Sequence, residues 1–387
     1  MKKFFVVLLT LALVAGGAFA EVSWGGYALS AVTIAGGSTA ENSDIIAGNG
    51  PSGSGAWGLY GLGRIQARVT NDEGTFGAFV RTGVNTGSDG NWGYRGFAWW
   101  QPISHVRLQI GFFDNMAVNY VVGWGFHASG ADDTVAFDGY GRRGRSFWSY
   151  NGEHTGALLS IAPIEGLSIK IGVPYAAHSG PKAAEIYNHT IGQITYDIAN
   201  IGQIAVTYQS GAGYRAWPTV KEDPGVVYAQ FYLTAVDKLQ LNVGLSYGLA
   251  GEYESSPKTT VAVSPPIKAG FGVAYAVSDA IGVKARFGAS FVGSRKVGSV
   301  ETKDPVLLGF DVMPYFDVGV CKVLVNMGIA VDLPDPGDSV FNWYLNPYIT
   351  KSAGGATFYA GLQVFSAQES GKDIIKWGIP IGIDYGF

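Results

Sequence analysis

The feature that most constrains the fold of this chain is a period-two alternation of apolar residues with small or polar ones. In one such segment Leu239, Leu241 and Val243 are separated by Gln240 and Asn242. Because successive side chains of a β-strand point to opposite faces, the pattern predicts a strand with one apolar face. No helical stripe of comparable length competes with it, and no apolar run reaches the about 18 residues that a membrane-spanning helix needs. The sequence therefore predicts an all-β fold.

The N-terminal residues predict a targeting segment rather than part of that fold. A basic start, a short apolar run over 4–14 and the small residues of Ala18-Phe19-Ala20 are typical of a secretory signal peptide. We expect residues 1–20 to be removed and residues 21–387 to form a single domain.

The composition of the chain leaves few folds open to an exported protein. Hydrophobic residues make up 47% and charged residues 14% of the chain, against about 25% charged in ordinary soluble domains. Without a spanning helix, such a composition is typical of a transmembrane β-barrel, whose closed sheet pairs its backbone N–H and C=O groups within the lipid. The net charge of −4 does not indicate a nucleic-acid partner, and the lone Cys321 excludes a disulfide framework.

Turn signals divide the mature chain into strands whose connections alternate in length. The expected strands lie near 22–32, 56–70, 75–86, 92–101, 104–113, 154–163, 166–176, 188–198, 202–210, 226–236, 238–249, 266–278, 280–292, 305–317, 320–331, 340–350, 356–367 and 374–387. Tight turns such as Asn71–Gly74 alternate with longer connections such as Asp332–Ser339. We expect a closed antiparallel transmembrane β-barrel of about 18 strands, with 16 and 20 as the alternatives.

The C-terminal segment Trp377–Phe387 carries the most specific motif. It ends in Phe387, with the aromatic Tyr385 two residues earlier and apolar residues at alternate positions before them. The segment resembles the closing strand of bacterial outer-membrane barrels and porins, and the strand and loop layout looks porin-like. The resemblance implies an outer-membrane location, contact with outer-membrane lipids, and recognition of Tyr385 and Phe387 by the barrel-assembly machinery. Porins are often homo-trimers, although no pattern here marks a trimer face. The signal peptide is similar in style to those of spirochaete exported proteins.

With the apolar residues facing outward, the alternate positions of the early strands are basic. These lumen positions hold Arg64, Arg68, Arg81, Arg95 and Arg107. A water-filled lumen is the simplest way to tolerate them, because a buried unpaired arginine costs several kcal/mol. We expect an arginine wall that contacts permeating ions; the alternative is that the arginines pair with loop acids and only hold the wall in shape. Over all lumen positions, basic residues outnumber acidic ones, which predicts a mild anion preference. The acids counted are Asp197, Asp311, Asp317 and Asp384.

The connection 114–153, after the fifth expected strand, is the longest in the chain. It carries Asp132, Asp133 and Asp138 among many aromatic residues. In general porins the loop at this position folds into the barrel, so the hypothesis is that these acids face the arginine wall across a constriction. The alternatives are an outer loop packed on its neighbours and two further strands.

These features favour a passive channel over an enzyme. The histidines lack metal-ligand spacing and the chain lacks a Gly-x-Ser-x-Gly elbow, so no catalytic site, metal or cofactor is expected. The leading interpretation is a porin through which small hydrophilic solutes and ions diffuse. Trp99, Phe97 and Tyr344 fall on lumen positions and leave a sugar-selective pore open. A transporter of hydrophobic compounds and a surface adhesin that binds through its outer loops also remain open.

Overall fold

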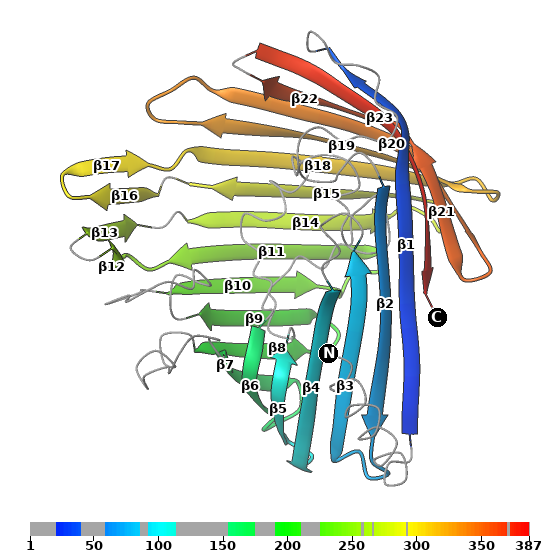
Figure 1. Ribbon diagram of the computed structural model, residues 1–387, viewed down its shortest axis with the longest axis vertical. Coiled ribbons are helices and arrows are strands. Elements are labelled where there is room, and N and C mark those ends of the chain that lie inside the picture. The colour runs from blue at the N-terminus through cyan, green and yellow to red at the C-terminus, as the bar shows by residue number, and fades with distance from the viewer. Residues whose placement is uncertain are drawn as a thin grey trace.

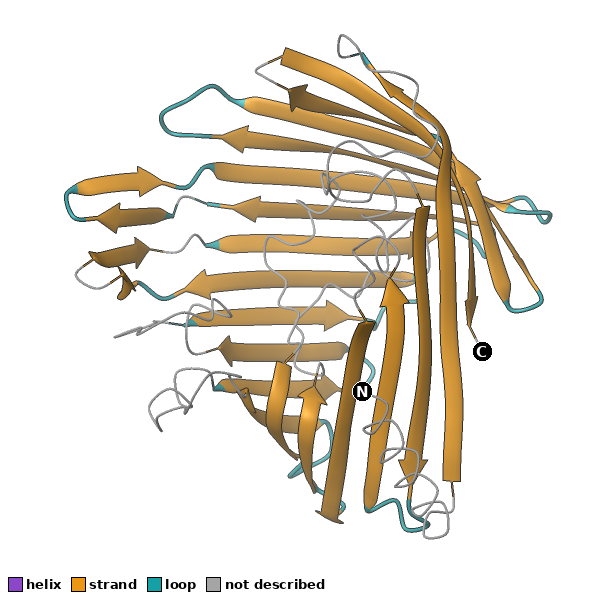
Figure 2. Ribbon diagram, in the orientation of Figure 1, coloured by secondary structure: helices purple, strands orange, loops and turns teal. Residues whose placement is uncertain are grey.

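A computed structural model describes residues 21–39, 59–85, 92–113, 154–174, 190–209, 225–256, 259–264, 267–291, 293–369 and 372–386. The first strands of its main sheet are β1 (Glu21–Ser38), β2 (Leu59–Thr70), β3 (Phe76–Asn85), β4 (Trp92–Ile103), β5 (Val106–Phe113), β6 (His154–Ile161), β7 (Leu167–Pro174), β8 (Ile191–Ile198), β9 (Gly202–Gln209) and β10 (Val226–Leu233). The others are β11 (Leu239–Gly248), β14 (Lys268–Ala276), β15 (Ile281–Ser290), β18 (Val306–Asp317), β19 (Lys322–Leu333), β20 (Val340–Ala353), β21 (Ala356–Gly361), β22 (Gln363–Glu369) and β23 (Lys372–Gly386). Every regular element in these ranges is a strand (Figure 2), and they contain no helix long and apolar enough to cross a membrane. The expected signal peptide lies outside the described residues.

The main sheet closes on itself. Neighbouring strands pair in antiparallel fashion in chain order, and β1 pairs with β23 as well as with β2 (Figure 1). β21 and β22 are separated by Leu362 alone and both pair with β20 and β23, so they share one position in the ring. The nineteen described strands of the main sheet therefore fill eighteen positions, and each position has a neighbour on both sides.

With one exception, the connections sort by length onto the two ends of the ring; the exception is the two-residue connection 370–371 between β22 and β23, which lies at the end of the longer connections. At one end, here the short-turn end, Asn71 accepts hydrogen bonds from the backbone N–H groups of Gly74 and Phe76, and Gly354 and Gly355 link β20 to β21 with positive φ angles. Glu21 begins β1 at this end, since it lies opposite Thr70. The other end, here the long-connection end, carries segments such as 334–339. The expected alternation of short and long connections is confirmed for the described residues.

Two hairpins depart from the expected layout. The segments between β11 and β14 and between β15 and β18 contain β12 (Gly251–Ser256), β13 (Thr259–Ser264), β16 (Ser294–Val297) and β17 (Val300–Lys303), which form a separate four-stranded sheet. They extend the ring beyond the long-connection end (Figure 1). We expected plain loops in both segments. The two strands of the second hairpin, β16 and β17, are short and polar on both faces, which hides their period-two signal.

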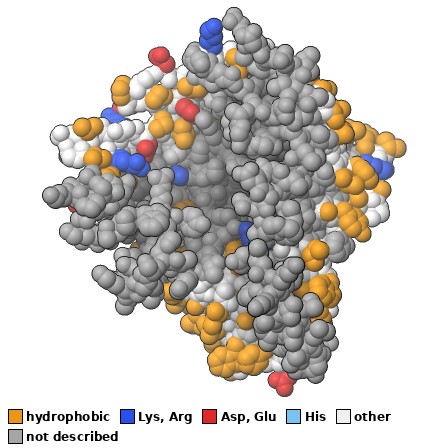
Figure 3. All heavy atoms as spheres, in the orientation of Figure 1, with side chains coloured by type: hydrophobic (Ala, Val, Ile, Leu, Met, Phe, Trp, Pro, Cys, Tyr) orange, Lys and Arg blue, Asp and Glu red, His pale blue; other side chains and the backbone are white. Residues whose placement is uncertain are grey.

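The described strands are apolar outside and polar inside. Tyr247 is 48% exposed and Leu245 is 47% exposed, whereas Asn242 and Ser246 on the same strand are buried. Figure 3 shows hydrophobic side chains gathered along the right and lower margins of the surface. This distribution reverses that of a soluble domain and fits a sheet whose outer face meets lipid.

Glycines allow large aromatic side chains to lie flat on the inner wall. Five inward aromatic residues stand directly opposite a glycine, and a Cβ at that glycine would collide with the facing side chain. The pairs are Trp99 with Gly77, Tyr315 with Gly282, Tyr344 with Gly328, Tyr348 with Gly361, and Tyr359 with Gly382. Aromatic rings that cover glycines across a strand pair stabilise the register of curved sheets.

Candidate functional site

The strand register places the predicted arginines on one wall. Arg68 on β2 lies opposite Phe79 on β3, and Arg81 on β3 lies opposite Arg95 on β4. The backbone of Arg64 lies opposite Tyr27 and Gly83, in the same alternation as Arg68. The register therefore places these arginines on the neighbouring strands β2, β3 and β4.

Arg68 and Arg107 converge on the indole of Trp99. The guanidinium carbon of Arg68 is 4.9 Å from the centroid of the Trp99 ring, and that of Arg107 is 4.8 Å from it. Trp99 is only 4% exposed, and its indole lies across Gly77. The sequence placed all three large side chains on the inner face but did not predict that they meet, because they come from β2, β4 and β5.

Further aromatic contacts extend this wall. The rings of Phe79 and Phe97 stack with centroids 5.1 Å apart, and the ring centroid of Phe97 is 6.0 Å from that of Trp99. The guanidinium carbon of Arg95 lies 4.5 Å from the centroid of the Phe112 ring. Aromatic faces stabilise guanidinium groups through their quadrupole and restrict their orientation.

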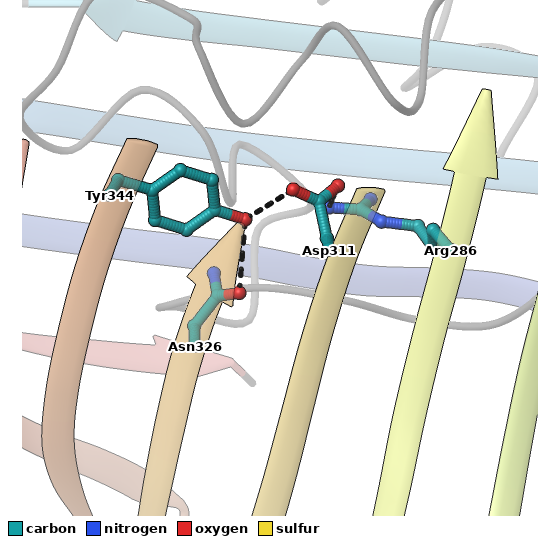
Figure 4. Close-up of polar contacts among 4 residues, drawn as sticks. All are labelled: Arg286, Asp311, Asn326 and Tyr344. Atoms are coloured by element: carbon teal, nitrogen blue, oxygen red, sulfur yellow. Dashed lines mark hydrogen bonds and ion pairs between the residues drawn. The ribbon is translucent and has the colours of Figure 1, made fainter. Parts of the chain in front are cut away.

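A second charged cluster lies on β15, β18, β19 and β20. Arg286 Nη2 is 3.3 Å from Asp311 Oδ2, and both side chains are 3% exposed. The Tyr344 hydroxyl donates a hydrogen bond to Asp311 Oδ1 at 2.5 Å, and the same hydroxyl lies 3.2 Å from Asn326 Oδ1 (Figure 4). Gly328 lies opposite both Asp311 and Tyr344 and leaves room for their side chains.

This cluster corrects the sequence-based view of two residues. Asp311 is not an independent lumen acid, because its charge and that of Arg286 neutralise each other. Tyr344 is not an open aromatic platform for sugars, because it is buried and its hydroxyl is used by Asp311. Of the other two aromatic residues considered for that role, Trp99 is buried as well and Phe97 is partly exposed.

A row of polar side chains follows the register around the inner wall. Its members, each directly opposite the next, are Arg107, Ser160, Lys170, Gln193, Thr207, Tyr228, Ser246, Lys268 and Ser290. One neighbouring pair is hydrogen-bonded, since Gln193 Nε2 donates to Thr207 Oγ1 at 2.8 Å. We call this set the polar row.

The polar row runs obliquely from one end of the ring towards the other. Arg107 lies just after the short turn between β4 and β5. Beyond Ser290 the register continues through Leu307 to Asp332, which lies just before the long connection 334–339. Because strands in a closed barrel are staggered, a row that follows the hydrogen-bonding direction climbs along the barrel axis. The polar row thus offers hydrogen-bonding groups along much of the inner wall.

Other predicted residues carry less structural information. Asp132, Asp133 and Asp138, the rest of the loop 114–153, and Phe387 lie outside the described residues. Tyr385 faces outward and is 41% exposed. His105 lies in the exposed turn after β4 rather than on the inner wall. Within the described ranges, no three His, Cys, Asp or Glu side chains gather as a metal site would require.

No protein-family model and no curated protein sequence matches this chain. Solved structures of outer-membrane proteins are similar to it over almost their whole length. OpdQ of Pseudomonas aeruginosa is 9% identical with a TM-score of 0.53, and the match covers 96% of this chain and 99% of that one. The trimer form of OmpT, an outer membrane protein of Vibrio cholerae, is 11% identical with a TM-score of 0.51, covering 95% and 99%. An anion-selective porin from Comamonas acidovorans is 11% identical with a TM-score of 0.50, again covering 95% and 99%. At such low identity the likeness shows the fold, and the chain has a porin-like β-barrel fold.

Proposed function

We propose that this chain is an outer-membrane porin through which small hydrophilic solutes and ions diffuse passively. The observation that carries the proposal is the polar row on the inside of a closed sheet whose outside is apolar. A closed sheet can cross lipid without unpaired backbone groups, and a polar inner wall is what a water-filled channel requires. A ring of eighteen positions is wide enough for an aqueous path, because barrel diameter grows with strand number.

The wall charges support a mild preference for anions. The polar row carries Arg107, Lys170 and Lys268, and its continuation carries one acid, Asp332. Arg68, Arg81 and Arg95 add positive charge near its start, and we also assign Arg64 to this wall. Charged walls tune the selectivity of pores, and the fold neighbour from Comamonas acidovorans is described as anion-selective.

The surroundings of the protein follow from the same proposal. We assign the outer apolar face to contact with outer-membrane lipids and the closing strand to recognition by the barrel-assembly machinery. The trimer form of the Vibrio cholerae neighbour supports assembly as a homo-trimer. Cross-linking of the refolded protein in lipid vesicles tests the trimer, and a monomeric product at all cross-linker concentrations would contradict it.

Planar-bilayer recording of the refolded mature chain tests the channel itself. We expect stepwise conductance and, in a potassium chloride gradient, a reversal potential that favours chloride. Bilayers treated with detergent alone are the control. Absence of an open channel would overturn the porin proposal and favour an adhesin or a transporter of hydrophobic compounds, and strong cation selectivity would overturn the anion preference.

A further inference from the structure

The pair formed by Arg68 and Arg107 differs from the other strong charge cluster of the inner wall. Both guanidinium groups lie within 5 Å of the centre of one indole ring, that of Trp99. In the part of the chain that the structure describes, neither arginine makes an ion pair or a hydrogen bond, and Arg107 Nε is buried without an acceptor. Arg286, by contrast, has Asp311. Among the described residues, these two neighbouring cations have no acid paired with them, and they form a site of unbalanced positive charge.

Trp99 is a common support for both guanidinium groups, which lie close to its ring. Its indole lies flat across Gly77, where any Cβ would collide with the ring, so the ring position is set by the backbone of β3. An arginine that stacks on an aromatic face keeps its N–H edges free for another partner. Because contact with the indole restricts both side chains, binding at those edges loses less side-chain entropy than binding to free arginines.

The chemistry of such a pair selects one class of ligand. A planar guanidinium donates two parallel hydrogen bonds to a carboxylate or a phosphate, which chloride cannot accept in the same way. An oxyanion between the two groups also relieves their mutual repulsion. We propose that Arg68 and Arg107, held by Trp99, bind a small oxyanion, the carboxylate or phosphate group of a solute, at the short-turn end of the lumen. The inference rests on the proposed channel function, because the lumen gives the solute access to the site.

The site stands where the polar row begins. Arg107 is the first member of that row, and Lys170 follows it two strands away. Lys170 is therefore a third cation, further along the wall, and Ser160 lies between it and Arg107 in the register. The pair lies at the short-turn end of the lumen, where a solute enters or leaves.

Equilibrium binding and channel recording together test this site. Inorganic phosphate and acetate are titrated separately into the refolded protein in detergent by calorimetry, and into planar bilayers against a chloride background. We expect saturable binding and a saturable reduction of the chloride current, both weakened about tenfold or more in Arg68→Gln and in Arg107→Gln, as for loss of a hydrogen bond to a charged group. Phosphate binding without acetate binding would assign the site to phosphorylated solutes, and the reverse result to carboxylates.

Two comparisons separate a site from a general field. Arg295→Gln removes one positive charge from the hairpin of β16 and β17, which lies outside the ring, and it should leave both titrations unchanged. Arg68→Lys and Arg107→Lys keep the charge but lose the planar fork, and they should weaken binding nearly as much as glutamine does. Equal affinity in the wild type and the glutamine variants, or full binding in the lysine variants, would overturn the site. A channel that conducts without binding either oxyanion refutes this inference alone, whereas absence of conductance refutes the porin proposal.

Discussion

Arg286 and Asp311 stand directly opposite each other on β15 and β18, with 3.3 Å between Nη2 and Oδ2. Both side chains are buried, so removal of one charge takes from the other its oppositely charged partner in this pair. We expect Asp311→Ala to lower the free energy of unfolding by about 3–5 kcal/mol, because a buried charge without its partner is strongly destabilising. Urea titration of the protein in lipid vesicles measures this change.

The double variant Arg286→Met with Asp311→Leu provides the control. It removes both charges and should unfold close to the wild-type midpoint, since replacing a whole buried pair by apolar residues is often neutral. If Asp311→Ala alone is as stable as the wild type, the pair does not contribute to the stability of this wall.

Gly77 determines where the Trp99 indole lies. A Cβ at Gly77 would overlap the ring, so Gly77→Ala should displace Trp99 and lower the free energy of unfolding by about 1–3 kcal/mol. It should also weaken oxyanion binding, because Arg68 and Arg107 would lose their common support. The matched control is Gly192→Ala on β8, where a Cβ meets nothing within 4 Å. Equal stability of the two variants would show that Gly77 is not required for this arrangement.

The strands and their faces were predictable from the sequence. Period-two alternation depends on residues that are close in the chain, and it located a strand at each position of the main sheet and the outward face of Tyr385. It also placed Arg68 and Arg107 on the inner face. These features follow from local geometry alone.

The contacts between strands were not predictable. The pairing of Arg286 with Asp311 and the meeting of Arg68, Arg107 and Trp99 depend on register between strands, which alternation does not define. The hairpin of β16 and β17 was missed because strands of four residues with polar side chains on both faces give no alternation. The break at Leu362, which divides one ring position between β21 and β22, leaves no signal in the sequence either.

Lys303, at the end of β17, contacts the connection between β19 and β20. Its Nζ donates a hydrogen bond to Asp335 Oδ2 at 2.8 Å, and this bond, with the charge of the carboxylate, raises the pKa of Lys303 above its ordinary value of 10.5. Because the folded pKa is raised, the stabilisation is fully present at neutral pH and is lost only as pH rises above 10.5. NMR titration of the Lys303 side chain should show a lower pKa in Asp335→Asn than in the wild type. An unchanged pKa would mean that the two groups do not interact in solution, where such exposed pairs are often weak.

Lys170 tests whether the polar row controls selectivity along its length. It lies between Ser160 and Gln193 on the inner wall, so its charge faces any ion that follows the row. Lys170→Glu should lower the chloride-to-potassium permeability ratio several-fold, because it replaces attraction of anions by repulsion at that point. Lys296→Glu on β16 makes the same charge change outside the ring. Salt screens this charge from the lumen, so the ratio should stay near that of the wild type. Reversal potentials in a potassium chloride gradient measure both variants. If the two substitutions shift the ratio equally, selectivity reflects the net charge of the protein, and the polar row has no special part in it.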